Sequence, residues 1–122
     1  MKILIADDDK ALCTILTSTF RKRGWQSLVA FDAMQALMYA RQKPDLILLD
    51  IRMPGGTGLT ALERLKASTQ MSDIPVVVIS AVEDPETAQT VEGMGAMAFV
   101  PKPLDPEALA DKIADLLGPN IP

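Results

Sequence analysis

The stretch Leu46-Ile47-Leu48-Leu49-Asp50 sets four consecutive aliphatic residues before a carboxylate. A short, unbroken apolar run is typical of a strand that is buried on both faces of a parallel sheet. The chain contains four further short apolar runs, at residues 3–6, 28–30, 76–79 and 98–100. The run at 28–30 is the weakest, so we expect the strand within residues 25–30 to lie nearer an edge of the sheet.

Apolar residues at helical spacing fill the gaps between these runs. Periodic groups occur at residues 12–20, 33–40, 59–65, 88–91 and 109–117. Asp9, Asp84 and Asp105 each stand before such a group as a candidate N-cap, and proline follows the last two at the first helical position. Five strands that alternate with five helices predict an α/β fold with a parallel sheet.

The composition limits the chemistry that the chain can perform. Its 122 residues suffice for one domain, and its 48% of hydrophobic residues is ordinary for a globular protein. The absence of histidine excludes Ser-His-Asp and Cys-His catalysis, histidine-ligated metals and a role as a phosphohistidine carrier. The single cysteine, Cys13, excludes an internal disulfide and a zinc site built from cysteines. Carboxylates, hydroxyls, lysine and the backbone remain.

The charge is modest and uneven. The formal net charge is −4; residues 1–61 carry 8 Lys and Arg against 6 Asp and Glu, whereas residues 62–122 carry 4 against 10. This acidic balance argues against direct binding of nucleic acid. No signal peptide is apparent, and no apolar run approaches the roughly 18–20 residues of a membrane span. The sequence therefore predicts a cytoplasmic protein without a membrane segment.

Polar side chains follow four of the five predicted strands. The run Asp7-Asp8-Asp9 follows the first, Asp50 the third, Ser80 the fourth and Lys102 the fifth. In a sheet of this type, ligands bind outside the carboxyl ends of the strands. Carboxylates that converge there repel one another unless a cation lies between them, and a few carboxylates with water suit Mg²⁺. The pattern predicts a magnesium site with a lysine and a hydroxyl beside it.

Each of these residues also has an ordinary structural interpretation. Asp9 can be a helix cap only, Asp7 and Asp8 can belong to a solvated loop, and Asp50 can form an ion pair with Arg52. Two glycine patterns are discounted. The G-x-G-x-x-A spacing at 93–98 precedes a strand instead of linking a strand to a helix, and the glycines at 55–58 lack the Lys-Ser/Thr of a phosphate-binding loop.

With these motifs in this order, the sequence resembles the receiver domain of two-component response regulators. The resemblance rests on Asp7-Asp8, on Asp-x-x-Met-Pro-Gly at 50–55, on Ser80-Ala81 and on Lys102-Pro103. It covers about residues 2–118 and implies a flavodoxin-like, doubly wound sheet with strand order 2-1-3-4-5 and helices on both faces. We accordingly expect one receiver domain at 1–118 and a tail, or the start of a linker, at 119–122.

The resemblance further implies how a metal is held. Asp50 would be the phosphoacceptor. Asp8 and Asp50 would bind Mg²⁺ directly, together with the backbone carbonyl of Arg52, and Asp7 would hold the metal mostly through water.

It also implies which residues meet the phosphoryl group. Lys102 would pair with the phosphoryl oxygens, Ser80 beside Ala81 would hydrogen-bond them after transfer, and Phe99 would follow as an aromatic switch. A cis peptide bond before Pro103 would aim Lys102 into the site.

The implied function is that of a signalling phosphoacceptor, not of an enzyme that acts on an external substrate. A phosphohistidine on a histidine kinase or a histidine phosphotransfer protein would supply the phosphoryl group, and the domain would catalyse its own phosphorylation and dephosphorylation. The fourth helix, fifth strand and fifth helix would then change their surface toward an output protein or domain, and dimerisation on phosphorylation is left open. Two alternatives stay open as well: a Mg²⁺-dependent phosphohydrolase and a degenerate receiver that serves only as a docking module.

Overall fold

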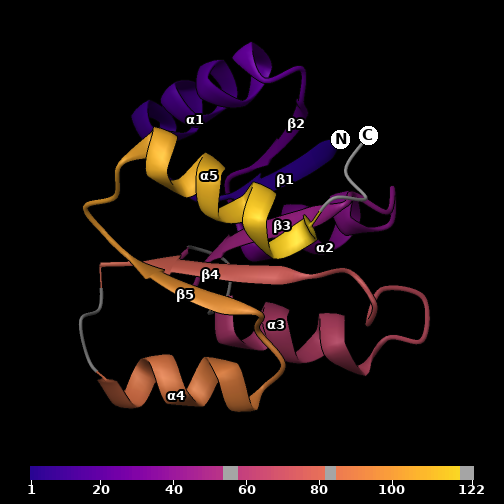
Figure 1. Ribbon diagram of the computed structural model, residues 1–122. Coiled ribbons are helices and arrows are strands. Elements are labelled where there is room, and N and C mark those ends of the chain that lie inside the picture. Colours follow the sequence, from indigo (N-terminus) through magenta and orange to yellow (C-terminus); the bar gives the residue numbers. More distant parts are fainter. Residues whose placement is uncertain (54–57, 82–84, 119–122) are drawn as a thin grey trace.

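A computed structural model describes residues 1–53, 58–81 and 85–118 of the chain. Its five strands form one parallel sheet in the order β2-β1-β3-β4-β5 (Figure 1). The strands are β1 (Lys2–Ala6), β2 (Gln26–Ala30), β3 (Leu46–Asp50), β4 (Val76–Ser80) and β5 (Ala98–Pro101). The predicted α/β class, the parallel pairing and the strand order are confirmed.

Helices cover both faces of this sheet (Figure 1). They are α1 (Lys10–Lys22), α2 (Ala33–Ala40), α3 (Gly58–Ala67), α4 (Pro85–Gly93) and α5 (Pro106–Leu117). The buried residues of α1 and α5 form one apolar core with one face of the sheet, and those of α2, α3 and α4 form a second core with the other face. In the described parts of the chain, no helix is long and apolar enough to cross a membrane.

Local sequence signals explain where several helices begin. The Asp9 carboxylate accepts a hydrogen bond from the Leu12 N–H at 3.0 Å, which confirms Asp9 as the cap of α1. Asp105 caps α5 in the same way, directly before the predicted proline. The predicted cap of α4, Asp84, lies outside the described residues. Asp32 caps α2, which the sequence pattern did not single out.

The strands extend further than the apolar runs. Asp50 pairs with Ile79 across β3 and β4, and Ser80 pairs with Pro101 across β4 and β5. Both polar residues are therefore the last members of their strands, because the backbone ladder continues after the aliphatic side chains end. The weak second run is confirmed as edge strand β2, whose middle residues are only half-buried.

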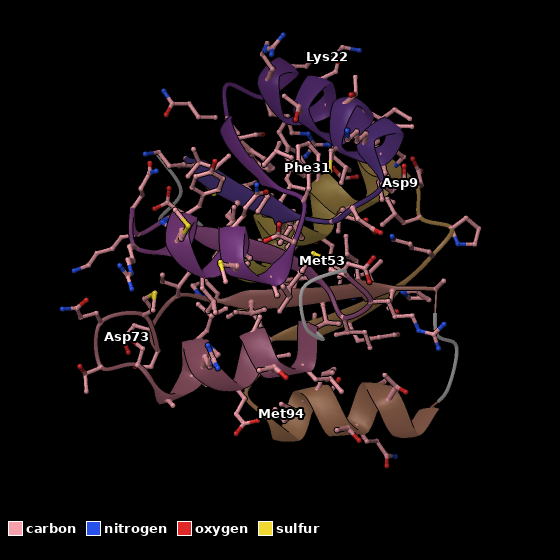
Figure 2. The ribbon with its side chains drawn as sticks, turned by 180° about the vertical axis from the view of Figure 1, so that it is seen from behind. Asp9, Lys22, Phe31, Met53, Asp73 and Met94 are labelled. Atoms are coloured by element: carbon pink, nitrogen blue, oxygen red, sulfur yellow. The ribbon has the colours of Figure 1, made fainter. Side chains whose placement is uncertain are left out.

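The two ends of the parallel strands face opposite sides of the molecule. Loops that follow strands leave the sheet at the carboxyl ends of the strands, and loops that precede strands enter it at the amino ends. Asp9 follows β1 and Asp73 precedes β4, so these two residues lie on opposite sides of the molecule (Figure 2). The strand order changes direction at β1: β2 is added on one side of β1, and β3, β4 and β5 are added on the other side. A reversal of this kind is the switch point at which such sheets bind ligands.

Candidate metal and phosphoryl site

Three carboxylates meet at the switch point. Asp7 and Asp8 directly follow β1, Asp50 ends β3, and one oxygen atom from each lies within 4.8 Å of the others. Asp7 and Asp50 are buried, with 0% and 4% exposure, whereas Asp8 is exposed to solvent. The pairing of β1 with β3 therefore brings together the carboxylates that the sequence predicted to converge, and Asp8 leaves the cluster open on one side.

Lys102 supplies the positive charge of the cluster. Its Nζ atom lies 2.7 Å from Asp7 Oδ2 and 3.0 Å from Asp50 Oδ2. Burial acts to lower the pKa of Lys102, but the hydrogen bonds and charges of Asp7 and Asp50 outweigh this effect and raise the pKa overall. The Lys102 N–H donates to the Ser80 carbonyl at 2.8 Å, and the Lys102–Pro103 peptide bond is cis, as the resemblance implies.

Backbone amides hold the other oxygens of the two buried carboxylates. The Asp9 N–H donates to Asp7 Oδ1 at 2.9 Å, and the Arg52 N–H donates to Asp50 Oδ1 at 2.8 Å. Each carboxylate is thus fixed by an amide on Oδ1 and by Lys102 on Oδ2. Sequence reasoning missed these amides because every residue except proline carries one, so residue type gives no signal.

The electrostatic balance of the cluster fits a divalent cation. Burial raises the pKa of Asp7, and the charge of Asp50 acts in the same direction, while hydrogen bonds from Lys102 and from the Asp9 N–H oppose the rise. Three carboxylates face one ammonium group, so two negative charges are unmatched when all three are ionised. Hard oxygen donors with a double excess of negative charge suit Mg²⁺ or a similar ion, and Asp7, Asp8 and Asp50 are the residues that could hold it.

The remaining predicted residues lie around this cluster on the neighbouring strands. Ser80 is fully buried at the end of β4. Ala81 follows it, is exposed, and lines a cavity of about 330 Å³ together with Asp9, Leu12, Lys102, Pro103 and Leu104. Phe99 lies on β5, half-buried, and packs against the core beneath α2, α3 and α4. Within the Asp-x-x-Met-Pro-Gly motif, Pro54 and Gly55 lie outside the described residues.

Cys13 also contacts the site, a position that no sequence motif predicted. Its Sγ atom donates to the Asp7 carbonyl at 3.4 Å from the buried face of α1. Burial, with the nearby charges of Asp7 and Asp9, raises the pKa of this thiol to about 11. Cys13 is therefore a protonated packing residue behind the carboxylates, not a nucleophile.

The sheet order and the acidic cluster define a class: doubly wound, flavodoxin-like domains that carry carboxylates and a lysine at the switch point. The family model of the response regulator receiver domain matches residues 3–114. The chain belongs to the response regulator receiver family, and it is a signalling phosphoacceptor domain of the two-component type.

Individual relatives agree with this assignment. Sporulation initiation phosphotransferase F of Bacillus subtilis is 32% identical over 117 residues, which cover 95% of this chain and 93% of that protein. The DNA-binding response regulator MtrA of Mycolicibacterium smegmatis is 36% identical over 122 residues, but these cover 98% of this chain and only 51% of MtrA. The chain thus spans nearly all of the first relative and about half of the second.

Solved structures show the same fold. A two-component response regulator from Clostridium difficile matches with a TM-score of 0.89 and 26% identity, over 96% of this chain and 95% of that one. CheY in the CheX-CheY-BeF3-Mg²⁺ complex from Borrelia burgdorferi matches with a TM-score of 0.89 and 25% identity, over 97% and 90% of the two chains.

Proposed function

We propose that Asp50 accepts a phosphoryl group from a phosphohistidine of a partner protein, with Mg²⁺ held by Asp7, Asp8, Asp50 and the backbone carbonyl of Arg52. The observation that carries this proposal is the position of Asp50, whose two carboxylate oxygens are fixed by the Arg52 N–H and by Lys102 beside two further carboxylates. The CheY relative whose structure was solved with BeF3 and Mg²⁺ supports the choice of metal.

The transfer step is a displacement at phosphorus. An oxygen atom of Asp50 forms the new P–O bond while the P–N bond to the donor imidazole breaks, and the electron pair leaves with that nitrogen. Bound Mg²⁺ would neutralise charge on the phosphoryl oxygens. Lys102 would contribute a second positive charge, and Ser80 would donate a hydrogen bond to the product. Ala81, which lines a cavity together with Lys102, would leave room beside the lysine because it carries only a methyl group.

The product would change the charge of the site and thereby the surface of the domain. Phosphorylation replaces a carboxylate of charge −1 by an acyl phosphate of charge roughly −2, and this change can bias a packed element between two arrangements. Phe99 on β5 would transmit the change to α4, β5 and α5, which would contact an output protein or domain. The same site would hydrolyse the phosphoaspartate and so reset the domain. We further propose a receiver unit at residues 1–118 that acts in the cytoplasm.

Phosphorylation by a small phosphodonor tests this function. Incubation with phosphoramidate and Mg²⁺ should add one acid-labile phosphate to the protein, and Asp50→Asn should abolish this addition. Asp73→Asn is the matched control, because Asp73 is exposed on the opposite side of the molecule (Figure 2) and should be phosphorylated like the wild type. Equal labelling of Asp50→Asn would exclude Asp50 as the acceptor.

The same preparation separates the two alternatives. A phosphohydrolase would turn over an added phosphomonoester many times per molecule, whereas a receiver would not. A docking module would bind no Mg²⁺, which calorimetric titration with MgCl₂ would show directly.

A further inference from the structure

The first residue of α3 lies unusually close to the backbone of the predicted phosphoacceptor. A Cβ atom placed on Gly58 would be 2.3 Å from the carbonyl oxygen of Asp50 and 2.4 Å from the Cα atom of Ile51. Real Cβ atoms essentially never approach another heavy atom closer than 3.0 Å. Both obstructing atoms belong to the backbone, so no side-chain rotation can make room for even a methyl group.

A hydrogen bond holds this close approach in place. The Gly58 N–H donates to the Ile51 carbonyl at 3.0 Å, which joins the start of α3 to the turn that leaves β3. The next residue of that turn, Arg52, donates its own N–H to Asp50 Oδ1. The position of α3 and the orientation of the Asp50 carboxylate are therefore linked through three consecutive residues, Asp50, Ile51 and Arg52.

A side chain at position 58 would displace the backbone that carries the site. Three side chains of α3 are buried in the core and fix the helix, namely Ala61, Leu62 and Leu65. The peptide after Asp50, by contrast, follows the last backbone pair of β3, that of Asp50 with Ile79. The separation from the Asp50 carbonyl oxygen would have to grow from 2.3 Å to at least 3.0 Å, and because Ile51 is buried in the same core as α3, this growth must shift the backbone of Asp50 and Ile51 against the start of the helix.

We propose that Gly58 is a positioning residue for the phosphoacceptor site. Its missing side chain lets α3 begin directly against Asp50 and Ile51, and this contact sets the positions of the Asp50 carboxylate and of the Arg52 carbonyl. The inference rests on the proposed function of Asp50, but it concerns metal binding as well as phosphoryl transfer. Misplacement of reacting groups by about 1 Å can cost on the order of 100-fold in rate, and loss of supporting contacts about 10–100-fold in metal affinity.

The test compares Gly58→Ala with the wild type in two measurements. Calorimetric titration with MgCl₂ gives the metal affinity, and acid-labile labelling with phosphoramidate at saturating Mg²⁺ gives the phosphorylation rate. We expect Gly58→Ala to bind Mg²⁺ about 10-fold more weakly and to be phosphorylated roughly 10–100-fold more slowly, per folded molecule. Urea unfolding of each variant supplies the folded fraction by which both values are corrected.

Two controls separate positioning from general stability. Gly93→Ala adds the same methyl group in α4, where no atom beyond its own helical turn and chain neighbours lies within 4 Å of the new Cβ, and should leave both values unchanged. Leu65→Ala opens a cavity in α3 while Gly58 stays intact, so it should lower stability without changing Mg²⁺ affinity per folded molecule.

Each other outcome decides against the inference. Unchanged Mg²⁺ affinity in Gly58→Ala, or an equal loss in Leu65→Ala, overturns it. Should Gly58→Ala be unfolded in buffer, the measurements are repeated in the cold with a stabilising osmolyte; a variant that still does not fold shows that the contact supports the whole domain and not the site. A wild type that binds Mg²⁺ but is not phosphorylated overturns the proposed function alone, and the metal affinities then still decide the role of Gly58.

Discussion

The buried Asp7 carboxylate destabilises the folded protein when no metal is bound. Its carboxylate is fully buried next to Asp50, and burial raises its pKa, so ionised Asp7 opposes folding at neutral pH. We expect Asp7→Asn to raise the free energy of unfolding in urea denaturation with EDTA present, because the neutral amide avoids the unfavourable burial of a charge. With saturating Mg²⁺ the gain should disappear, because the metal then stabilises only the wild type. A loss of stability in EDTA would contradict this account.

The thiol of Cys13 should make stability depend on pH in the alkaline range. Its pKa is about 11 in the native state against an ordinary 9.0, so the contribution is complete below pH 9 and is lost as the pH rises toward 11. The contribution is at most about 3 kcal/mol. The free energy of unfolding in urea should fall over this pH interval in the wild type relative to Cys13→Ala, which has no thiol to ionise. Parallel pH profiles for the two proteins would rule the effect out.

At the level of single residues, the sequence predicted the chemical groups and not their partners. Asp50, Lys102 and Ser80 could be found because an isolated polar residue at the end of an aliphatic run is conspicuous. The amides of Asp9 and Arg52 could not be found, since their role depends on the path of the backbone after each strand. The role of Gly58 could not be predicted for the same reason, because the sequence does not show which glycine lies against the backbone of another segment.

The turn between α4 and β5 has little room for a side chain at Gly95. Gly95 has a φ of 103°, and a Cβ there would lie 3.2 Å from Cγ of Lys66. Lys66 cannot easily withdraw, because its Nζ atom donates to the carbonyls of Ser72 at 3.2 Å and Ile74 at 3.0 Å. We expect Gly95→Ala to lower the free energy of unfolding by about 1–3 kcal/mol in urea denaturation.

The neighbouring glycine provides the comparison for this element. Gly93→Ala lies only two residues earlier, in the last position of α4, and its Cβ meets nothing within 4 Å. It should leave stability unchanged or raise it slightly, since alanine favours a helix more than glycine does. Equal losses for the two substitutions would show that the positive φ of Gly95 is not the cause.

The elements themselves were more predictable than their ends. Short apolar runs located the five strands, and apolar spacing located the five helices, with candidate capping aspartates before three of them, because burial and the need to cap N–H groups act along the local sequence. The inclusion of Asp50 and Ser80 in their strands depends on pairing with residues of other strands, which no local pattern contains.

For the molecule as a whole, Mg²⁺ should be a stabilising ligand. A cation that binds the native cluster and not the unfolded chain raises stability by about 2.7 kcal/mol at a concentration 100 times its Kd. The melting temperature of the wild type should therefore rise steadily with MgCl₂, whereas NaCl at matched ionic strength should not reproduce the rise. Asp50→Asn removes one carboxylate of the cluster and should flatten the dependence. A melting temperature indifferent to Mg²⁺ would contradict a native metal site.

The residues of the cluster are far apart in the sequence, from Asp7 after the first strand to Lys102 after the last strand. During synthesis Asp7 and Asp8 are made first, Asp50 follows after some forty residues, and Lys102 is added only when β5 is complete. A nascent or truncated chain that ends before β5 has the carboxylates without the ammonium group that neutralises them. The ion pairs that hold the two buried carboxylates can therefore form only after all five strands have been synthesised.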